Sequence, residues 1–247
     1  SPVKLNNHAN FSRVYGYTYQ TPYVVIFFDD DIMHPQMLER ELRVLNIFPQ
    51  AVIVAAGTNF IHLERDMGKF AEFFGKPNAE YLPNKAALCR LILQGFNLCF
   101  DSVMYRSEIL EDVSPFQSFK KWGDRPFLLH LSAKGGVAVL KEKLVNYRIH
   151  PGQDSQSSPI DELEFIFKLF DFYKNSLPQP LSLSDNKLFK SWATNNAILS
   201  ASSFAKDFSE YIKVLKIFKQ KGFFAFRYVK FRGLWYLLKA MKKIIGF

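Results

Sequence analysis

The first part of the chain alternates between short apolar runs and stretches whose apolar residues recur at helical spacing. Residues 23–28, YVVIFF, form a β-branched and aromatic run that predicts a buried strand. Residues 34–48 carry apolar side chains at helical spacing, with Pro35 in the first turn, and predict a helix. Residues 51–57, AVIVAAG, predict a second strand. This strand–helix–strand order predicts a parallel sheet with a right-handed crossover.

Beyond residue 158 the pattern contains helices only, which divides the chain into two regions. Residues 1–158 predict an α/β domain with a mainly parallel sheet flanked by helices, and residues 159–247 predict a helical C-terminal region. The polar residues 151–159 are either a connector or a lid that closes over a ligand. Further helices are expected at residues 86–95, 124–136, 160–175, 187–205 and within 207–245, and further strands at 98–106 and 137–150.

The composition is that of a folded protein, and its charge is unevenly distributed. Of the 247 residues, 48% are hydrophobic and 16% aromatic, which excludes a disordered chain. Residues 1–205 carry 21 basic and 21 acidic residues, whereas residues 206–247 carry 11 basic and 2 acidic residues. The whole net charge of +9 therefore belongs to the C-terminal segment. Cys89 and Cys99 lack metal-binding spacing, so buried thiols in a reducing compartment are expected.

Three consecutive aspartates follow the first predicted strand. In an extended chain, Asp29 and Asp31 point to one side and Asp30 to the other. Carboxylates at the carboxyl end of a parallel strand lie where open α/β sheets bind ligands, and Mg²⁺ or Mn²⁺ would relieve their mutual repulsion. An acidic surface turn is the alternative. A phosphatase of the haloacid dehalogenase type is another, but its motif requires Thr or Val where this chain has Met33.

Four segments together resemble the inverting family 2 glycosyltransferases with the GT-A fold. In order and spacing these are FFDDDIMHPQML, FDSVMYRSEIL, WGDRPFLLHLSAKGG and LVNYRIHPGQDS, and the similarity covers residues 6–158. The resemblance implies a GT-A-like α/β fold. It also implies an enzyme that uses Mg²⁺ or Mn²⁺ to transfer a sugar from a nucleotide-diphosphate sugar to an acceptor hydroxyl, with inversion.

The resemblance further implies roles for residues at the donor. The DxD element falls on Asp29 to Asp31, so Asp29 and Asp31 are expected to bind a metal ion that holds the donor diphosphate, with Asp30 also at the donor. Arg148 and His150 fall near the leaving phosphates, and His150 is a candidate metal ligand as well. The alternatives are an arginine that pairs with a surface acid and an ordinary histidine at a strand end.

The same resemblance places the catalytic base and the acceptor. Asp124 is the candidate general base, although Gly123 stands where the family usually has Glu. From the residues alone, Asp124 could equally be a helix N-cap. Trp122 is expected either to stack on a sugar ring or to belong to the core, and Asp101 and Arg106 are expected to border the acceptor.

The resemblance also implies that an N-terminal portion is missing. In GT-A enzymes, strands and helices ahead of the DxD strand build most of the nucleoside pocket. Only 22 residues precede YVVIFF here, so the chain is expected to be a fragment that lacks a βαβ portion of about 60–90 residues. Exposed sheet edges would then favour association, and a homo-oligomer is expected.

Residues 223–247 interleave aromatic and basic side chains. On a helical projection from residue 232 onward, Arg232, Lys239, Lys242 and Lys243 share one side and apolar residues take the other. No uncharged run approaches the about 20 residues that a transmembrane helix needs. The pattern predicts a helix on the surface of an anionic membrane. The alternative is a helix packed on the body with a solvated basic face, and no recognition motif predicts nucleic-acid binding.

Together with the pattern of the C-terminal segment, the resemblance implies a metal-dependent inverting glycosyltransferase in the cytoplasm, peripheral at the inner face of the plasma membrane. Its expected partners are a nucleotide-sugar donor and a glycan or lipid-linked acceptor of cell-surface polysaccharide synthesis. The alternatives are a non-catalytic, truncated binding or scaffold protein and a metal-dependent phosphatase.

Overall fold

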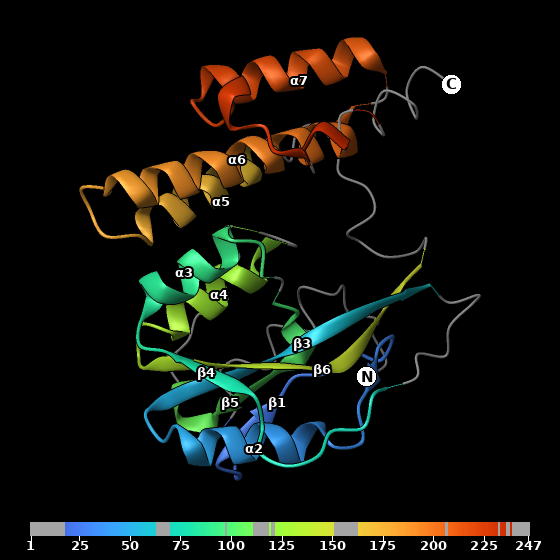
Figure 1. Cartoon of the computed structure of the whole chain (residues 1–247), viewed down its shortest axis with the longest axis vertical. Coiled ribbons are helices and arrows are strands. Elements are labelled where there is room, and N and C mark those ends of the chain that lie inside the picture. The colour runs from blue at the N-terminus through green and yellow to red at the C-terminus, as the bar shows by residue number, and fades with distance from the viewer. Residues whose placement is uncertain are drawn as a thin grey trace. The chain divides into compact units, whose positions relative to one another are not determined.

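The computed structural model divides the chain into two compact units (Figure 1). The sheet unit comprises residues 1–92 and 96–153, and the helical unit comprises residues 93–95 and 154–247. The boundary predicted at residue 158 and the predicted loop 151–159 lie outside the described residues. Those described are residues 18–62, 70–96, 98–110, 119, 122–150, 163–205, 207–231, 233–235 and 238.

The sheet unit is built on a six-stranded mixed sheet. Its strands are β1 (Tyr23–Val25), β2 (Ile32–Met33), β3 (Ala51–His62), β4 (Ala79–Leu82), β5 (Val103–Arg106) and β6 (Gly136–Ile149). The strand order is β1-β5-β3-β6-β2, and β4 pairs with β6 off this path. Among the described strands, β3 and β6 pair in parallel and the other pairs are antiparallel.

The sheet is therefore mixed, where the sequence predicted a mainly parallel one. β1 and β3 both run antiparallel to β5, so they run in the same direction as each other, as the strand–helix–strand pattern predicted. However, β5 lies between them: Tyr105 is paired with Val24 on one side and with Ile53 on the other. A local pattern cannot reveal this insertion, because β5 follows β1 by many residues in sequence.

Strand lengths also differ from the sequence prediction. β1 stops at Val25, so the residues that lead into the aspartates are not part of the strand. β3 instead continues past its predicted end to His62, whereas β6 is one continuous strand over nearly the predicted range. These two long strands pair along their length and form the middle of the sheet.

Helix α2 (Met37–Ile47) covers one face of the sheet (Figure 1). Its buried face carries Met37 together with two charged residues, Arg40 and Glu41. Leu38 and Leu42, which supported the predicted apolar periodicity, are exposed instead. The pattern located this helix, but the helix is rotated so that two ionisable side chains, Arg40 and Glu41, face inward.

Helices α3 (Lys85–Leu93) and α4 (Asp124–Leu131) lie on the other side of the sheet (Figure 1). α3 is followed by Gly95 with φ +104°, a left-handed conformation in which glycine commonly closes a helix, as predicted. α4 ends earlier than predicted, before the glycines that follow it. Cys89 and Cys99 are both buried and neither forms a disulfide, which confirms the prediction of buried thiols.

The described part of the helical unit contains three long helices: α5 (Leu163–Asn175), α6 (Leu183–Phe204) and α7 (Phe208–Gln220). The side chain of Ser182 caps α6 and that of Asp207 caps α7, each by accepting a backbone N–H bond three residues on. Aromatic rings fill the space between the helices, with centroids 4.7 Å apart for Phe170 and Trp192 and 5.7 Å apart for Phe170 and Phe218. Within the described residues, no helix combines the length and the apolar character that crossing a membrane requires.

Candidate functional site

The three aspartates follow β1 in a turn, and their surroundings differ. Asp29 and Asp30 form the turn itself, with Asp29 exposed and Asp30 partly exposed. Asp31 is buried, with 7% of its surface exposed, and leads directly into β2. Because this segment is a turn, the strand alternation expected from the sequence does not hold. Asp29 and Asp31 therefore lie in different environments.

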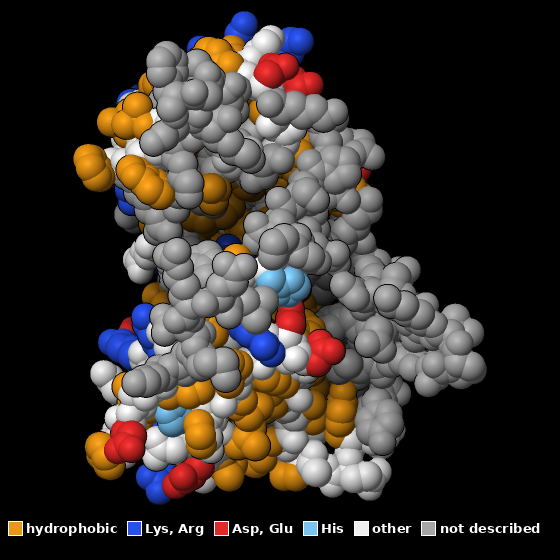
Figure 2. Space-filling view, turned by 90° about the vertical axis from the view of Figure 1, so that its right-hand side faces the viewer, with side chains coloured by type: hydrophobic (Ala, Val, Ile, Leu, Met, Phe, Trp, Pro, Cys, Tyr) orange, Lys and Arg blue, Asp and Glu red, His pale blue; other side chains and the backbone are white. Residues whose placement is uncertain are grey.

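The end of β6 holds the aspartate turn in place. The backbone N–H of Arg148 donates to Asp31 Oδ1 at 2.8 Å, and its guanidinium donates to the backbone oxygens of Asp30 and Asp29. His150 Nε2 lies 3.3 Å from Asp30 Oδ2. Figure 2 shows a histidine side chain beside acidic and basic side chains at the surface. The structure thus brings Arg148 and His150 into contact with the aspartate turn.

A second buried carboxylate faces Asp31 from a different segment. Asp101 lies in the short helix η2 (Phe100–Ser102), ahead of β5, and is almost fully buried. Burial, the hydrogen-bonding contact with Asp31 and the negative charges of Asp31 and Asp124 together raise the pKa of Asp101 to about 9. Oδ2 of Asp31 and Oδ2 of Asp101 have no hydrogen-bond donor among the described residues. A proton or a cation between these two carboxylates would relieve their repulsion.

Asp124 is the first residue of α4 and is close enough to Asp101 to raise its pKa. Gly123 occupies the N-cap position, so the alternative reading of Asp124 as the N-cap is wrong. Asp124 has an exposed surface, but many protein atoms lie close to its carboxylate and displace water from it. This desolvation raises its pKa to about 6, against the opposing effect of Arg125. The carboxylate can therefore gain or lose a proton near neutral pH.

The remaining predicted residues lie in two places. Trp122 is partly buried two positions before Asp124. Arg106 lies at the end of β5 that pairs with Tyr23 at the start of β1, which is the opposite end from the aspartate turn. Its guanidinium donates to the backbone oxygens of Ala51, at 2.9 Å, and Pro49, at 3.1 Å. The structure therefore does not bring Arg106 together with the other candidate residues.

The carboxylates present suit a hard divalent cation. Mg²⁺ accepts one or two protein carboxylates and completes its coordination with water and phosphate oxygens. Asp31 and Asp101 offer buried carboxylate oxygens without donors among the described residues, and Asp30, next to Asp31 in sequence, is in contact with His150. Within the described part of the chain, no group of three or more His, Cys, Asp or Glu side chains is arranged to hold a metal ion by itself. A site at these residues would therefore have to be open and share its cation with a ligand.

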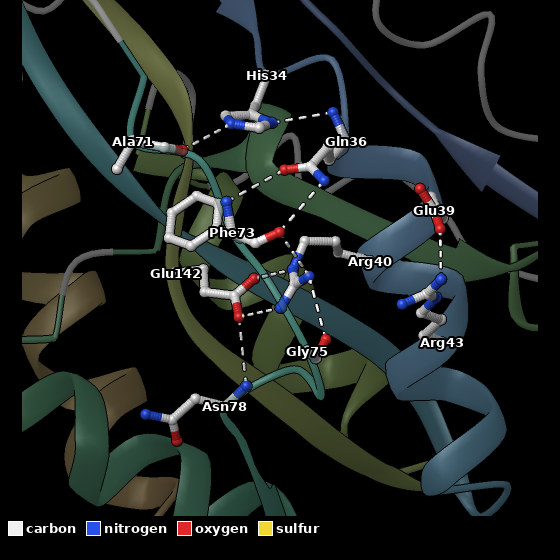
Figure 3. A network of polar contacts seen from close by, with 10 residues as sticks. All are labelled: His34, Gln36, Glu39, Arg40, Arg43, Ala71, Phe73, Gly75, Asn78 and Glu142. Carbon is white, nitrogen blue, oxygen red and sulfur yellow. Dashed lines mark hydrogen bonds and ion pairs between the residues drawn. The ribbon is translucent and has the colours of Figure 1, made fainter.

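A buried ion pair that the sequence analysis missed joins α2 to β6 (Figure 3). The guanidinium of Arg40 donates two hydrogen bonds to the carboxylate of Glu142. It also reaches the backbone oxygens of Phe73 and Gly75, each at 3.5 Å, and Glu142 accepts the backbone N–H of Asn78 at 3.3 Å. The pair therefore fixes the chain between Phe73 and Asn78 against the sheet.

His34 and Gln36 extend this network toward the aspartate turn (Figure 3). The backbone N–H of Gln36 donates to His34 Nδ1 at 2.9 Å, which leaves His34 Nε2 to donate to the Ala71 backbone oxygen at 3.0 Å. The Gln36 side chain pairs with the backbone of Phe73 in both directions, each at 3.3 Å. The sequence contained one sign of this network. Arg40 and Glu41 occupy helical positions between the apolar residues Met37, Val44 and Leu45, where a buried face needs partners for its polar groups.

Comparisons with known proteins leave the family open. The sequence matches no protein-family description, and no curated protein is significantly similar to it. Among solved structures, the chain is similar to residues 1–349 of TarS from S. aureus in complex with UDP-GlcNAc, a nucleotide-sugar. The likeness has 13% sequence identity and a TM-score of 0.43, and it covers 82% of this chain and 69% of TarS 1–349. Because the TM-score is below 0.5, function has to be inferred from the residues of this chain.

Proposed function

We propose that this chain is a metal-dependent inverting glycosyltransferase that moves a sugar from a nucleotide-diphosphate sugar to an acceptor hydroxyl. One observation carries the proposal: segments far apart in sequence converge on the aspartate turn. Asp31 contacts Asp101 and the Arg148 backbone, His150 contacts Asp30, and Asp124 is electrostatically coupled to Asp101. These are the segments whose order and spacing resemble the family motifs.

In this proposal the donor diphosphate binds at the aspartate turn. Asp30 and Asp31 would hold the cation together with the donor phosphates, and Asp101 lies against Asp31 from η2. A Mg²⁺ or Mn²⁺ held by these residues would supply positive charge beside the departing nucleoside diphosphate. Arg148 positions the turn, because its guanidinium donates hydrogen bonds to the backbone oxygens of Asp29 and Asp30. Asp29, at the exposed tip, faces solvent, and in this proposal its role is to attract the cation.

Asp124 is proposed to take the proton from the acceptor hydroxyl. A hydroxyl is a weak nucleophile until a positioned base removes its proton, a contribution of about 10²–10⁴ in rate. A carboxylate with a pKa of about 6 is mostly ionised at pH 7 and is more basic than an ordinary aspartate. Attack from the side opposite the diphosphate would invert the anomeric carbon, and Trp122 beside Asp124 is proposed to pack against a sugar ring.

The acceptor proposed from the motif resemblance is a glycan or a lipid-linked intermediate of cell-surface polysaccharide synthesis. Such acceptors are assembled at membranes, so the proposed location is the cytoplasmic face of the plasma membrane. The nucleotide-sugar donor and the divalent cation are the partners on which the test depends.

Calorimetric titration with nucleotide-diphosphate sugars, with Mn²⁺ and with a chelator, tests the proposal. Donor binding should require Mn²⁺ and should be lost in Asp31→Asn. The matched control is Glu39→Gln, which removes an exposed carboxylate of α2 outside the site. Transfer to an acceptor should invert the anomeric centre of the product. Absence of metal-dependent donor binding would favour a scaffold protein, and release of phosphate from simple esters would favour a phosphatase.

A further inference from the structure

Large apolar side chains are exposed on the segment that follows α7. The chain first buries Phe223 and Phe224, then forms the short helix η7 (Phe226–Tyr228), and is again helical at the described residues 231, 233–235 and 238. Phe226 is 74% exposed and Phe231 is 87% exposed. The exposed apolar residues of this segment, called the apolar stripe below, are Phe226, Phe231, Leu234, Trp235 and Leu238.

Four members of the apolar stripe share one side of a helix. Phe231, Leu234, Trp235 and Leu238 follow the spacing i, i+3, i+4 and i+7, which puts them on a single face. Gly233 is buried on the opposite side. An amphipathic helix of a globular unit normally turns its apolar face to the core, but this one turns it outward.

Contacts with α6 hold this orientation. Asn195 Nδ2 donates to the backbone oxygen of Tyr228 at 3.0 Å, and Asn195 Oδ1 accepts the backbone N–H of Lys230 at 3.1 Å. A Cβ at Gly233 would overlap Asn195 Oδ1, so a larger residue at this position would displace the Asn195 side chain. The Leu234 N–H then bonds to the Lys230 oxygen at 2.9 Å and begins the helical pattern. The backbone is thus fixed to α6 while the apolar stripe faces away from it.

Exposed basic residues lie next to the apolar stripe in sequence. Arg227 and Lys230 are exposed beside it, and Lys221 is exposed just before it. From residue 206 to residue 247 the chain carries 11 basic and 2 acidic residues, and both acids lie near the start of α7. A partner of this surface must therefore offer negative charge at its rim and an apolar interior.

We propose that the apolar stripe docks the helical unit on the surface of an anionic lipid bilayer. Aromatic side chains and leucines would enter the interface between headgroups and acyl chains, and Arg227 and Lys230 would lie against lipid phosphates. Nucleic acid fits less well, because Leu234 and Leu238 offer no surface for stacking bases. The proposal is independent of sugar transfer, since it concerns the helical unit alone.

Sedimentation of the full chain with lipid vesicles tests the proposal. Binding to mixed phosphatidylglycerol–phosphatidylcholine vesicles should exceed binding to phosphatidylcholine vesicles and should weaken as NaCl is raised. Replacing Phe231 and Trp235 by Ser should lower the partition constant roughly tenfold or more, because the variant loses the free energy gained when the two rings move from water into the bilayer. The matched control is Leu183→Ser, which alters an equally exposed apolar residue at the start of α6 and should leave binding unchanged.

A charge variant and a fluorescence measurement complete the test. Arg227→Glu with Lys230→Glu should weaken binding to the anionic vesicles, whereas Lys187→Glu on α6 should not. Anionic vesicles should shift the tryptophan emission of the wild type to the blue, and Trp235→Phe should remove this shift while keeping binding. Equal binding by the Phe231/Trp235 variant would overturn the proposal. So would self-association of the chain that this variant abolishes in the absence of vesicles.

Discussion

At the scale of single residues, Asp124 combines access to solvent with a raised pKa. If it is the general base, only its ionised form supports transfer. Because its pKa is about 6, the transfer rate should fall as pH is lowered through that value and should level off above it. Asp124→Asn should lower the rate by about 10²–10⁴ at pH 7. The measurement is a pH profile of the transfer rate for both proteins.

Measuring donor binding distinguishes a role of Asp124 as the general base from a role in metal binding. Asp124→Asn should bind donor and Mn²⁺ as tightly as the wild type in a calorimetric titration, because Asp124 is proposed to face the acceptor. Glu39→Gln should keep both the rate and the profile. Loss of donor affinity in the Asp124 variant would move this residue from the acceptor to the donor site.

Glu41 predicts a pH dependence of stability. Its carboxylate is fully buried in α2, neither oxygen has a hydrogen-bond partner among the described residues, and desolvation raises its pKa well above the ordinary value. The folded state therefore keeps a proton that the unfolded state releases once pH exceeds the ordinary glutamate pKa. Stability should then decrease as pH rises from that value toward the raised pKa.

Replacing Glu41 by methionine removes this penalty. At pH 7, Glu41→Met should raise the free energy of unfolding by about 1–3 kcal/mol, because no buried carboxyl has to be accommodated. The difference from the wild type should shrink as pH is lowered toward the ordinary glutamate pKa. Urea unfolding across this pH range measures both effects, and a variant that is less stable at pH 7 would contradict the prediction.

The sequence predicted individual site residues better than their contacts. Asp31 and Asp101 were both selected, but for the metal and the acceptor respectively. They face each other because β5, which Asp101 precedes, is inserted beside β1. Arg106 shows the same limit in reverse: four residues of extended strand carry it to the far end of β5, away from Asp101. Both outcomes depend on strand pairing that no local pattern encodes.

At the scale of secondary-structure elements, two ion pairs on α2 offer a direct comparison. Arg40 and Glu142 have side chains 3% and 9% exposed, whereas Arg43 and Glu39 have side chains 53% and 57% exposed. Glu142→Gln leaves the Arg40 charge buried without its partner and should lower the free energy of unfolding by about 3–5 kcal/mol. Glu39→Gln should cost less than about 1 kcal/mol. Denaturant unfolding of the two variants measures the contrast.

A double variant distinguishes loss of the pair from loss of shape. Arg40→Met with Glu142→Met removes both charges and should be more stable than Glu142→Gln alone, since no unpaired charge stays buried. Equal destabilisation by the single and double variants would mean that the backbone contacts of Phe73 and Asn78 matter more than the ion pair.

Local periodicity predicted where the helices lie along the chain, but it did not predict which side of α2 is buried. The helices α2, α3 and α5 begin within a few residues of their predicted starts, because helical spacing of apolar residues is a local property. The inward face of α2 depended on Glu142, which comes from a strand more than a hundred positions later. β1 is shorter than its apolar run for a similar reason: the turn at Asp29 is held by Arg148 from β6.

At the scale of the whole molecule, the two proposed activities belong to different units. The proposed donor and acceptor residues all lie in the sheet unit, whereas the excess positive charge and the apolar stripe lie in the helical unit. Each unit has its own buried core, formed by aliphatic residues in the sheet unit and by aromatic rings in the helical unit. The uneven charge marks only residues 206–247, which are part of the helical unit.

Separate cores predict two thermal transitions that respond to different changes. Mn²⁺ with a nucleotide-diphosphate sugar should raise only the transition of the sheet unit. A ligand at a hundred times its Kd stabilises the state that binds it by about 2.7 kcal/mol. Phe170→Ala, which empties a buried site in the helical unit, should lower only the other transition, with a loss of about 3–5 kcal/mol in that unit. Differential scanning calorimetry of the wild type and this variant assigns each transition.

Asp31→Asn provides the control for the ligand effect. It should abolish the shift caused by Mn²⁺ and donor while leaving the Phe170-sensitive transition unchanged, because Asp31 belongs to the sheet unit alone. A ligand shift in the Phe170-sensitive transition would place the donor site in the helical unit. A single transition that moves with every change would mean that the two cores unfold together, since independent cores cannot respond as one to substitutions confined to either of them.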